Sequence, residues 1–346
     1  MLVTFLRHTS TLLHGRSSML QKRILVSLTL SVLAMSAGAG PLYDQDNGPL
    51  SGIYNFVDST EGADLLPEGR FAWSLSSITS SHAASARRDD ELLVFDGETT
   101  RMEFRLRYAP SERLEIGLEL PYIWHSEGNL DSLIDTWHDV FNLPGGNRDT
   151  RASDLLEFSY VNAAGEQLSV VENSNGPGDV RLTAGWKLGD NPDHARALRF
   201  AVTAPTGAAE DLHGSDAVTV GVGYAGDVRN TTADGKLSLY YRLHATWIDE
   251  PAVLPDFYNE WVAHAAAGFG YAAADWLELR AQVLARTATH DVDIPTLGES
   301  SWILSFGGNI RLGDNYELSL SVGEDIKVES SPDVSFQLSL RYRPGD

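Results

Sequence analysis

Three short stretches of the sequence combine residue types that hydrolases use. His125-Ser126-Glu127, His138-Asp139 and Leu212-His213-Gly214-Ser215-Asp216 each place a histidine near a carboxylate, and two of them add a serine. A serine activated by an oriented histidine could attack the ester bonds of a lipid. Neighbouring residues point to opposite faces of a strand and do not face each other on a helix, so neither of the first two stretches forms a relay by itself. The third is typical of a turn. We therefore predict no catalytic residue and no enzyme.

The sequence also gives no sign of a metal or cofactor site. There is no cysteine, which excludes disulfides and thiolate ligands, and no HExxH-type spacing. The glycines of "GPGDVRL" (176–182) come before a strand and are not followed by a helix, so they are typical of a turn and not of a phosphate-binding loop. We predict no cofactor and no metal ligand.

The first 39 residues are typical of a secretory signal peptide. A short basic segment precedes twelve mostly apolar residues (24–35), and Ala37-Gly38-Ala39 fits the small-residue cleavage pattern. Translation could start at Met1 or Met19, and we expect the mature chain to begin near Gly40. Cleavage would remove four basic residues and no acid, and would change the net charge from −22 to −26. Such a charge argues against a nucleic-acid partner.

From residue 70 onward, apolar and polar side chains alternate in runs of about ten residues, the length that a tilted strand needs to cross a membrane. The segment "RLEIGLELPYIWH" (113–125) is one example. The alternation predicts twelve strands, at residues 70–81, 95–108, 113–125, 178–188, 197–206, 216–226, 235–247, 259–272, 275–288, 300–312, 315–325 and 334–343.

A soluble sandwich would also alternate, with its apolar face inward. Two features favour a membrane barrel. Aromatic residues such as Tyr122, Trp124 and Tyr342 lie at strand ends, where the two interfacial girdles fall, and tight turns alternate with longer acidic loops. We therefore predict an all-β fold, a transmembrane antiparallel β-barrel of about twelve strands. A further hairpin, 154–162 with 166–172, makes fourteen strands if it enters the membrane, and leaves twelve if it stands above it in the second outer loop.

The polar face of the strands should line the barrel interior, and on it basic residues outnumber acidic ones. Cross-strand Arg–Glu pairs could join the wall, and the excess of arginine could favour anionic solutes. The acids gather instead in the loops, where they form a solvated rim or share divalent cations with lipopolysaccharide. The candidate lumen-lining residues are Arg101, Glu103, Arg105, Arg107, Glu115, Glu119, Arg181, Arg242, Arg280 and Arg311.

Residues 130–146, "LDSLIDTWHDVFNLPGG", depart from the alternation, because their apolar side chains have the spacing of one helix face. The candidate contact residues on this face are Leu130, Leu133, Ile134, Trp137 and Phe141. The segment follows a strand that ends at Tyr122 and Trp124, so we expect one amphipathic helix in the long second outer loop. It would lie on the outer leaflet or fold over the barrel mouth, with His138-Asp139 on its wet face.

Residues 40–68 do not alternate and are rich in Gly, Pro, Asp and Asn. Because they precede the first strand, they could fold into the lumen from the periplasm as a hatch, or remain a loose periplasmic tail. We divide the chain into a signal peptide (1–39), this N-terminal segment (40–68) and an outer-membrane β-barrel (69–346).

Several stretches together resemble an outer-membrane family of gammaproteobacteria catalogued as domain of unknown function 3187. They are "FDGETTRMEFRLRYAPSERLEIGLELPYIWHSEGNLDSLIDTWHDVFNLPGGNRD" (95–149), "GPGDVRLTAGWKL" (176–188) and "APTGAAEDLHGSD" (204–216), with a looser likeness at "GPLYDQDNGPL" (40–50). The resemblance implies an outer-membrane barrel and brings no substrate or catalytic residue. A fold-level analogy to channels for fatty acids and aromatic hydrocarbons implies an N-terminal hatch and loop helices that gather ligands.

These observations lead to three hypotheses for a protein of the cell outer membrane, exported through its signal peptide. The first is a narrow channel or gated passage for a small amphipathic or hydrophobic solute. The second is a non-transporting barrel whose loop 126–177 binds lipopolysaccharide or an envelope partner. The third, which the residues favour least, is a lipid-modifying enzyme that would use His125, His138 or His213. The expected partners are outer-membrane lipid and lipopolysaccharide, the barrel assembly machinery during biogenesis, and in the first case a small solute.

Overall fold

The computed structural model describes residues 41–54, 56, 62–128, 130, 155–162, 165, 167–189, 191, 193–327 and 331–344. The predicted signal peptide lies outside these residues, and so does the predicted helix 130–146, apart from Leu130. In the described part of the chain, no helix is long and apolar enough to cross a membrane.

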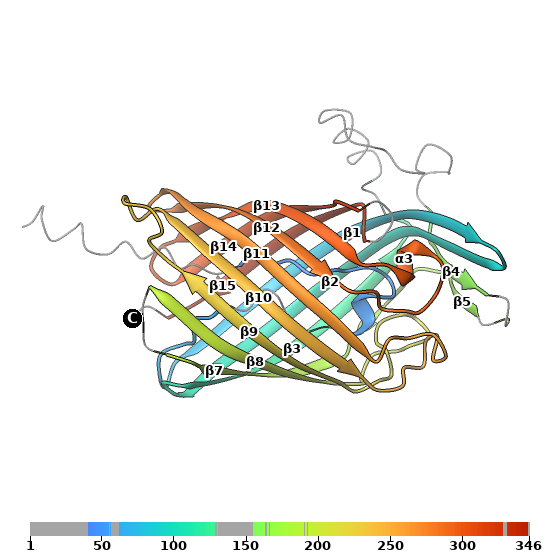
Figure 1. Cartoon of the computed structure of the whole chain (residues 1–346), viewed down its shortest axis with the longest axis horizontal. Helices are drawn as coiled ribbons and strands as arrows, with labels where there is room; N and C mark the ends of the chain where they lie inside the picture. The colour runs from blue at the N-terminus through green and yellow to red at the C-terminus, as the bar shows by residue number, and fades with distance from the viewer. Residues whose placement is uncertain are drawn as a thin grey trace, which may run out of the picture. The chain divides into compact units, whose positions relative to one another are not determined.

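Twelve antiparallel strands close into a barrel (Figure 1). Closure occurs because β1 (Phe71–Arg88) pairs both with β2 (Glu91–Ser111) and with the last strand, β15 (Val334–Tyr342). The other wall strands are β3 (Leu114–Ser126), β7 (Val180–Lys187), β8 (His194–Ala204), β9 (Thr219–Val228), β10 (Leu237–Ile248), β11 (Trp261–Ala274), β12 (Leu277–Arg286), β13 (Ser301–Leu312) and β14 (Tyr316–Asp325). Each pairs with the next along the chain, and β3 pairs with β2 and β7. The predicted barrel is confirmed.

Two further strands lie outside the barrel wall, and a third continues the ladder of β7 along β3. The hairpin of β4 (Glu157–Val161) and β5 (Gln167–Val170) pairs with Leu92–Asp96 at the start of β2, and β6 (Ser174–Pro177) pairs with the end of β3. The hairpin predicted in the second outer loop therefore exists and does not enter the wall, which leaves the strand count at twelve. It also explains why β1 and β2 extend beyond their predicted ends, since β2 supplies the edge on which β4 adds.

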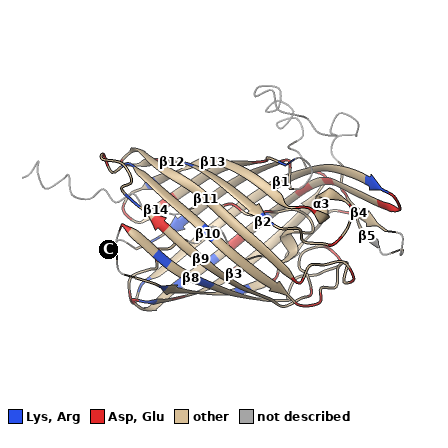
Figure 2. Ribbon diagram, in the orientation of Figure 1, with Lys and Arg blue, Asp and Glu red and all other residues tan. Residues whose placement is uncertain are grey.

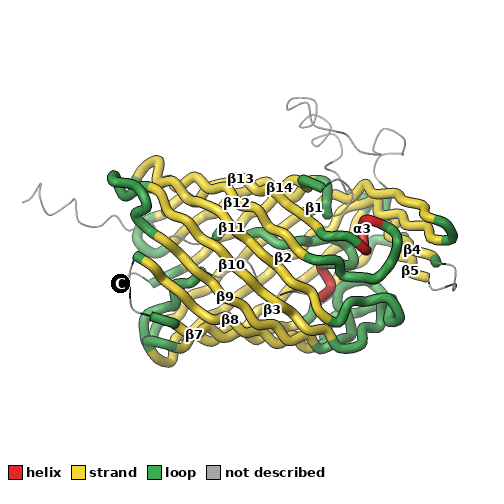
Figure 3. Tube along the Cα trace, viewed as in Figure 1, coloured by secondary structure: helices red, strands yellow, loops and turns green. Residues whose placement is uncertain are grey.

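The connections differ in length at the two ends of the barrel (Figure 3). At one end, here called the turn end, β2–β3, β11–β12 and β13–β14 are joined by tight turns, and Gly313 in the last of these has a φ of +70° that favours glycine. At the other end, the loop end, residues 205–218, 249–260 and 287–300 form longer connections. Bacterial barrels place such long loops on the cell surface and the short turns in the periplasm.

The two faces of the wall differ in polarity as the period of two requires. On β10 the outward Leu243 is 57% exposed, whereas its neighbour Arg242 is 1% exposed. On β7 the outward Leu182 is 60% exposed, and Arg181 beside it is 0% exposed. The wall is thus apolar outside and charged inside, the inverse of a soluble barrel.

Aromatic rings lie at both ends of the strands. Trp73 stacks on Tyr342 with ring centroids 6.1 Å apart at the turn end, and Tyr122 lies 4.5 Å from Trp124 at the loop end. These are the positions at which interfacial girdles anchor a barrel in a bilayer.

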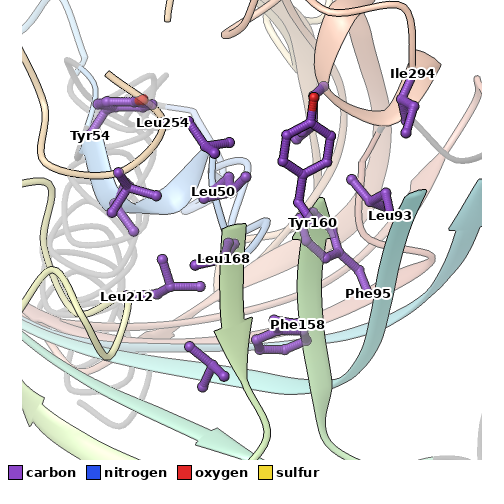
Figure 4. Close-up of a cluster of buried hydrophobic side chains, with 14 of the residues drawn as sticks. Leu50, Tyr54, Leu93, Phe95, Phe158, Tyr160, Leu168, Leu212, Leu254 and Ile294 are labelled. Carbon is purple, nitrogen blue, oxygen red and sulfur yellow. The ribbon is translucent and has the colours of Figure 1, made fainter. Parts of the chain in front are cut away.

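The main apolar core lies at the loop end and not between the strands (Figure 4). It brings together the short helix η1 (Gly52–Tyr54), the β4–β5 hairpin and the loop containing α3 (Pro295–Gly298). We call it the loop-end cluster; its buried members are Leu50, Ile53, Tyr54, Ala84, Leu93, Phe95, Phe158, Tyr160, Leu168, Val170, Leu212, Ala217, Ile248, Val253, Leu254, Val262, Ile294 and Leu297.

Candidate functional site

We call residues 41–66 the inner segment; its described residues, 41–54, 56 and 62–66, lie in the interior of the barrel. A twelve-stranded barrel is wider than the eight-stranded size that side chains alone can fill, so additional chain is needed to close it. Leu42, Asp44 and Tyr54 are each 0% exposed. The inner segment makes hydrogen bonds to β1, β2, β3, β7, β8, β9, β12, β13 and β15.

Two aspartates of the inner segment form polar centres with the wall. Asp44 accepts hydrogen bonds from Gln337 Nε2 (2.8 Å), Gln282 Nε2 (3.4 Å) and the Ser305 hydroxyl. Burial raises the pKa of Asp44 to about 6, although these hydrogen bonds oppose the shift.

Asp46 lies two residues further on and pairs with a cation. Its carboxylate accepts from Arg286 Nε, from Ser51 Oγ (2.8 Å) and from the backbone N–H of Gly48 (3.1 Å). Burial raises the pKa of Asp46, but Arg286 and these hydrogen bonds together outweigh burial and hold the pKa below its usual value. The partners of Asp46 thus favour its carboxylate form, whereas burial makes Asp44 easier to protonate than an exposed aspartate.

Arginines of the wall also donate to carbonyl groups of the inner segment. Arg280 Nη1 donates to Pro41 O (3.0 Å), Arg101 Nη2 donates to Gly52 O (3.0 Å), and Arg181 Nη1 donates to Phe56 O. An irregular segment has carbonyl groups with no strand or helix partner, and each costs free energy when buried. These contacts explain why more arginines than carboxylates point into the barrel. The carbonyl oxygens of the inner segment accept the hydrogen bonds that additional carboxylates would otherwise accept.

The last part of the inner segment is held near the turn end by carboxylates of the wall. Ala63 N–H donates to Asp227 Oδ2 (2.8 Å), and Leu66 N–H donates to Glu115 Oε2 (2.9 Å). Asp64 forms an ion pair with Arg229 in which both side chains are partly exposed.

Most candidate lining residues lie in ion pairs on the inner face. Arg105 contacts Glu103 (2.6 Å) and Glu119 (2.9 Å), and Arg181 also pairs with Glu119. Further pairs are Arg107–Glu115 (3.3 Å), Arg199–Glu115 (2.8 Å), Arg242–Asp227 (2.9 Å) and Arg280–Glu278 (2.9 Å). Arg311 has the same strand parity as the buried Asn309 but is exposed at the turn end. Figure 2 shows the charged residues along the strands.

The histidine and serine of the stretches 125–127 and 212–216 that could have been catalytic form hydrogen bonds with other parts of the fold. Ser215 Oγ donates to Asp179 Oδ2 (3.2 Å), and His125 Nε2 lies 3.2 Å from Leu212 O. The structure does bring Ser174 Oγ within 3.1 Å of His213 Nε2, a pair that sequence spacing could not reveal. Burial lowers the pKa of His213. No carboxylate hydrogen bond to His213 occurs among the described residues, so the pair lacks the orienting acid of a triad. His138-Asp139 lies outside the described residues.

A second feature, missed by sequence reasoning, is a surface pocket at the loop end. It has a volume of about 540 Å³ and lies between β5 and the loops 205–218 and 249–260. Its lining includes Leu168, Val253 and Leu254 together with the acids Glu210 and Asp216. We call it the outer pocket. No signal in the sequence predicts it, because its lining comes from one strand and two loops that are far apart in the sequence.

Other predictions about sites stay open. In the described ranges, no group of three or more His, Asp or Glu side chains could hold a metal ion. The alternative function through loop 126–177, and the contact residues Leu133, Ile134, Trp137 and Phe141, depend on residues outside the described ones and stay predictions.

The fold resembles that of solved outer-membrane channels. The COG4313 outer membrane channel from Pseudomonas putida F1 is 16% identical with a TM-score of 0.51, over 81% of this chain and 96% of that one. The NanC porin is 7% identical with a TM-score of 0.45, over 80% of this chain and all (100%) of that one. The Ralstonia pickettii toluene transporter TbuX is 11% identical with a TM-score of 0.39, over 90% and 96%. The first likeness shows a shared barrel fold.

No curated protein matches this chain. The model of a family described as protein of unknown function (DUF3187) matches residues 17–344, nearly the whole chain, in agreement with the resemblance noted from the sequence. The chain therefore belongs to the DUF3187 family.

Proposed function

We propose that this protein is a gated outer-membrane passage for a small amphipathic or hydrophobic solute, and that the inner segment is its plug. The barrel fold, shared with an outer-membrane channel, supports a passage. In the conformation described here, the inner segment would close the passage, so conduction requires that it leave the lumen or rearrange within it.

One observation carries this proposal. None of the described residues of the inner segment is part of a β-ladder, and its polar contacts to the wall are hydrogen bonds and ion pairs that involve a side chain, while its tip packs in the loop-end cluster. Water can replace contacts of this kind once the lumen is hydrated. A segment built permanently into the wall would instead be expected to share backbone pairing with a strand.

The kind of solute that could pass is inferred from the side chains that it would meet in the lumen and at the loop end. The lumen is lined by paired charges, and the loop end is closed by an apolar cluster that includes Leu50 and Tyr54 of the inner segment. A solute with both polar and apolar parts can make favourable contacts at each stage.

Single-channel recording in planar bilayers tests the proposal. The full chain should be mostly closed with brief openings, and a variant lacking residues 41–56 should conduct steadily. Equal conductance of the two proteins would contradict the role of the inner segment as a plug. Heat-modifiable electrophoretic mobility reports whether each barrel has folded, and the Asp46→Ala variant described below tests the same point without a deletion.

A further inference from the structure

We infer that the outer pocket is a binding site for an organic cation with a compact apolar body. The inference rests on the proposed function, because it identifies where a solute would be captured before the passage opens. Its support comes from the shape of the pocket, the fixed position of its walls, its partly apolar floor and its charge.

The walls of the pocket are held in place by a buried carboxylate. Asp179, which is 1% exposed, accepts hydrogen bonds from the N–H groups of Thr206 (2.9 Å), Gly207 (2.8 Å) and Ser215 (2.9 Å). Ser215 O in turn accepts from Ala252 N–H (3.0 Å) in the facing loop. The two loops are thus fastened to the barrel and to each other, so the pocket exists before a ligand arrives and need not be ordered by it.

Backbone conformation around the pocket is unusual. Leu212, Asp216 and Leu254 have φ values of +57°, +53° and +52°, in the left-handed region that side chains other than glycine seldom adopt. Residues held in this way persist only where the surroundings fix them, and they cluster at functional sites. Here all three lie in the two loops that form the pocket walls.

The floor of the pocket is partly apolar. Leu168, Val253 and Leu254 line the pocket and belong to the loop-end cluster, which also contains Leu50 and Tyr54 of the inner segment. Figure 4 shows Leu50 and Leu254 in this cluster. An apolar body in the pocket could contact the three lining side chains, and the volume of about 540 Å³ is typical of small-molecule sites.

The charge of the surrounding loops selects the sign of the ligand. Residues 205–218 and 249–260 contain seven acids and no lysine or arginine. Glu210 and Asp216 line the pocket, and both are exposed. A concave site edged by one sign of charge attracts the opposite sign and raises its local concentration. Because the described residues offer no cluster able to hold a metal ion, an ammonium group on an apolar body fits better than a bare divalent cation.

Calorimetric titration of the full chain in lipid nanodiscs tests this inference. The probe is 2-(1-naphthyl)ethylammonium, and 1-naphthylacetate has the same ring with the opposite charge. Empty nanodiscs provide the partition blank. We expect saturable one-to-one binding of the ammonium probe and at least tenfold weaker binding of the acetate. Binding does not require an open lumen, so this result and the conductance of the deletion variant can fail independently.

Three variants locate the site. Ala252→Trp places a large side chain in the pocket from an exposed position and should abolish binding. Glu210→Gln combined with Asp216→Asn should weaken it about fivefold, the effect of two surface charges near a ligand cation. Asp256→Asn removes an exposed acid of the facing loop 249–260 that does not line the pocket, and should leave binding unchanged.

Several results would overturn the inference. They are the absence of saturable binding to the folded full chain, equal binding of the acetate, retained binding in Ala252→Trp, or equal weakening by Asp256→Asn. Binding of Mg²⁺ alone that is lost in the same variants and competes with the probe would reassign the pocket to divalent cations.

Discussion

The pair between Asp46 and Arg286 should decide how firmly the inner segment is held. Both side chains are 3% exposed, and the Arg286 Nε–H donates to Asp46. In Asp46→Ala the guanidinium would remain buried without its carboxylate while the segment is docked, but would be hydrated once the segment leaves. Removing one partner of a buried ion pair typically costs about 3–5 kcal/mol. The docking equilibrium should therefore shift toward the open state by roughly a hundred- to several-thousand-fold.

A single cysteine can report this shift, because the chain has none of its own. Gln45 is half-buried in the inner segment, so Gln45→Cys should react slowly with a maleimide–polyethylene glycol that is too large for the closed lumen. Adding Asp46→Ala should accelerate the labelling and increase the open fraction in bilayer recordings. Folding is checked by heat-modifiable mobility.

Two controls make this prediction specific. Asp64→Ala breaks a partly exposed pair with Arg229, which should be worth less than about 1 kcal/mol, and should have little effect. The double variant Asp46→Ala/Arg286→Ala removes both charges and should recover part of the docking free energy. If Asp46→Ala labels no faster than Asp64→Ala, and the double variant behaves like the single one, the reasoning is refuted.

Three further predictions use the labelling of Gln45→Cys or, for the β4–β5 hairpin, limited proteolysis. Leu50→Ala, in the loop-end cluster, should weaken docking by about 2–5 kcal/mol and speed the labelling of Gln45→Cys; an unchanged rate would show that the cluster does not hold the segment. Burial raises the pKa of Asp44 to about 6 in the docked state, so the docked state binds a proton more tightly than the released one. Docking of the inner segment should therefore strengthen by about tenfold as the pH falls from 7.5 to 5, and this dependence should vanish in Asp44→Asn. The pKa of Asp46 is lowered, so its effect on docking should appear only in more acid solution. Phe158→Ala should make the β4–β5 hairpin sensitive to limited proteolysis, because Phe158 is 0% exposed and packs against Phe95. The heat-modifiable mobility of the barrel should not change. Loss of that mobility would mean that the hairpin supports the wall.

Predictions that rest on the local period of two agree with the structure. The alternation of Arg242 with Leu243 identifies the outward and inward faces, because successive side chains of any strand point to opposite sides. The polarity of the inward face, the aromatic strand ends and the unequal connections then distinguish a membrane barrel from a soluble one. The same reasoning could state that β4 and β5 form a hairpin but not where it lies, since that depends on the free edge of β2.

The contacts that make the candidate site could not be derived in this way. Asp46 and Arg286 are 240 positions apart, and residues 40–68 have no periodicity from which to predict a partner. Ser174 meets His213 only because β6 adds to the end of β3 near the loop 205–218. The sequence by itself determined that the chain forms a barrel wall and which face of each strand points outward, because both follow from local alternation, whereas the choice between twelve and fourteen wall strands needed the structure. Only the tertiary structure decided what fills the lumen and where the outer pocket lies, because both depend on closing the sheet and bringing distant loops together.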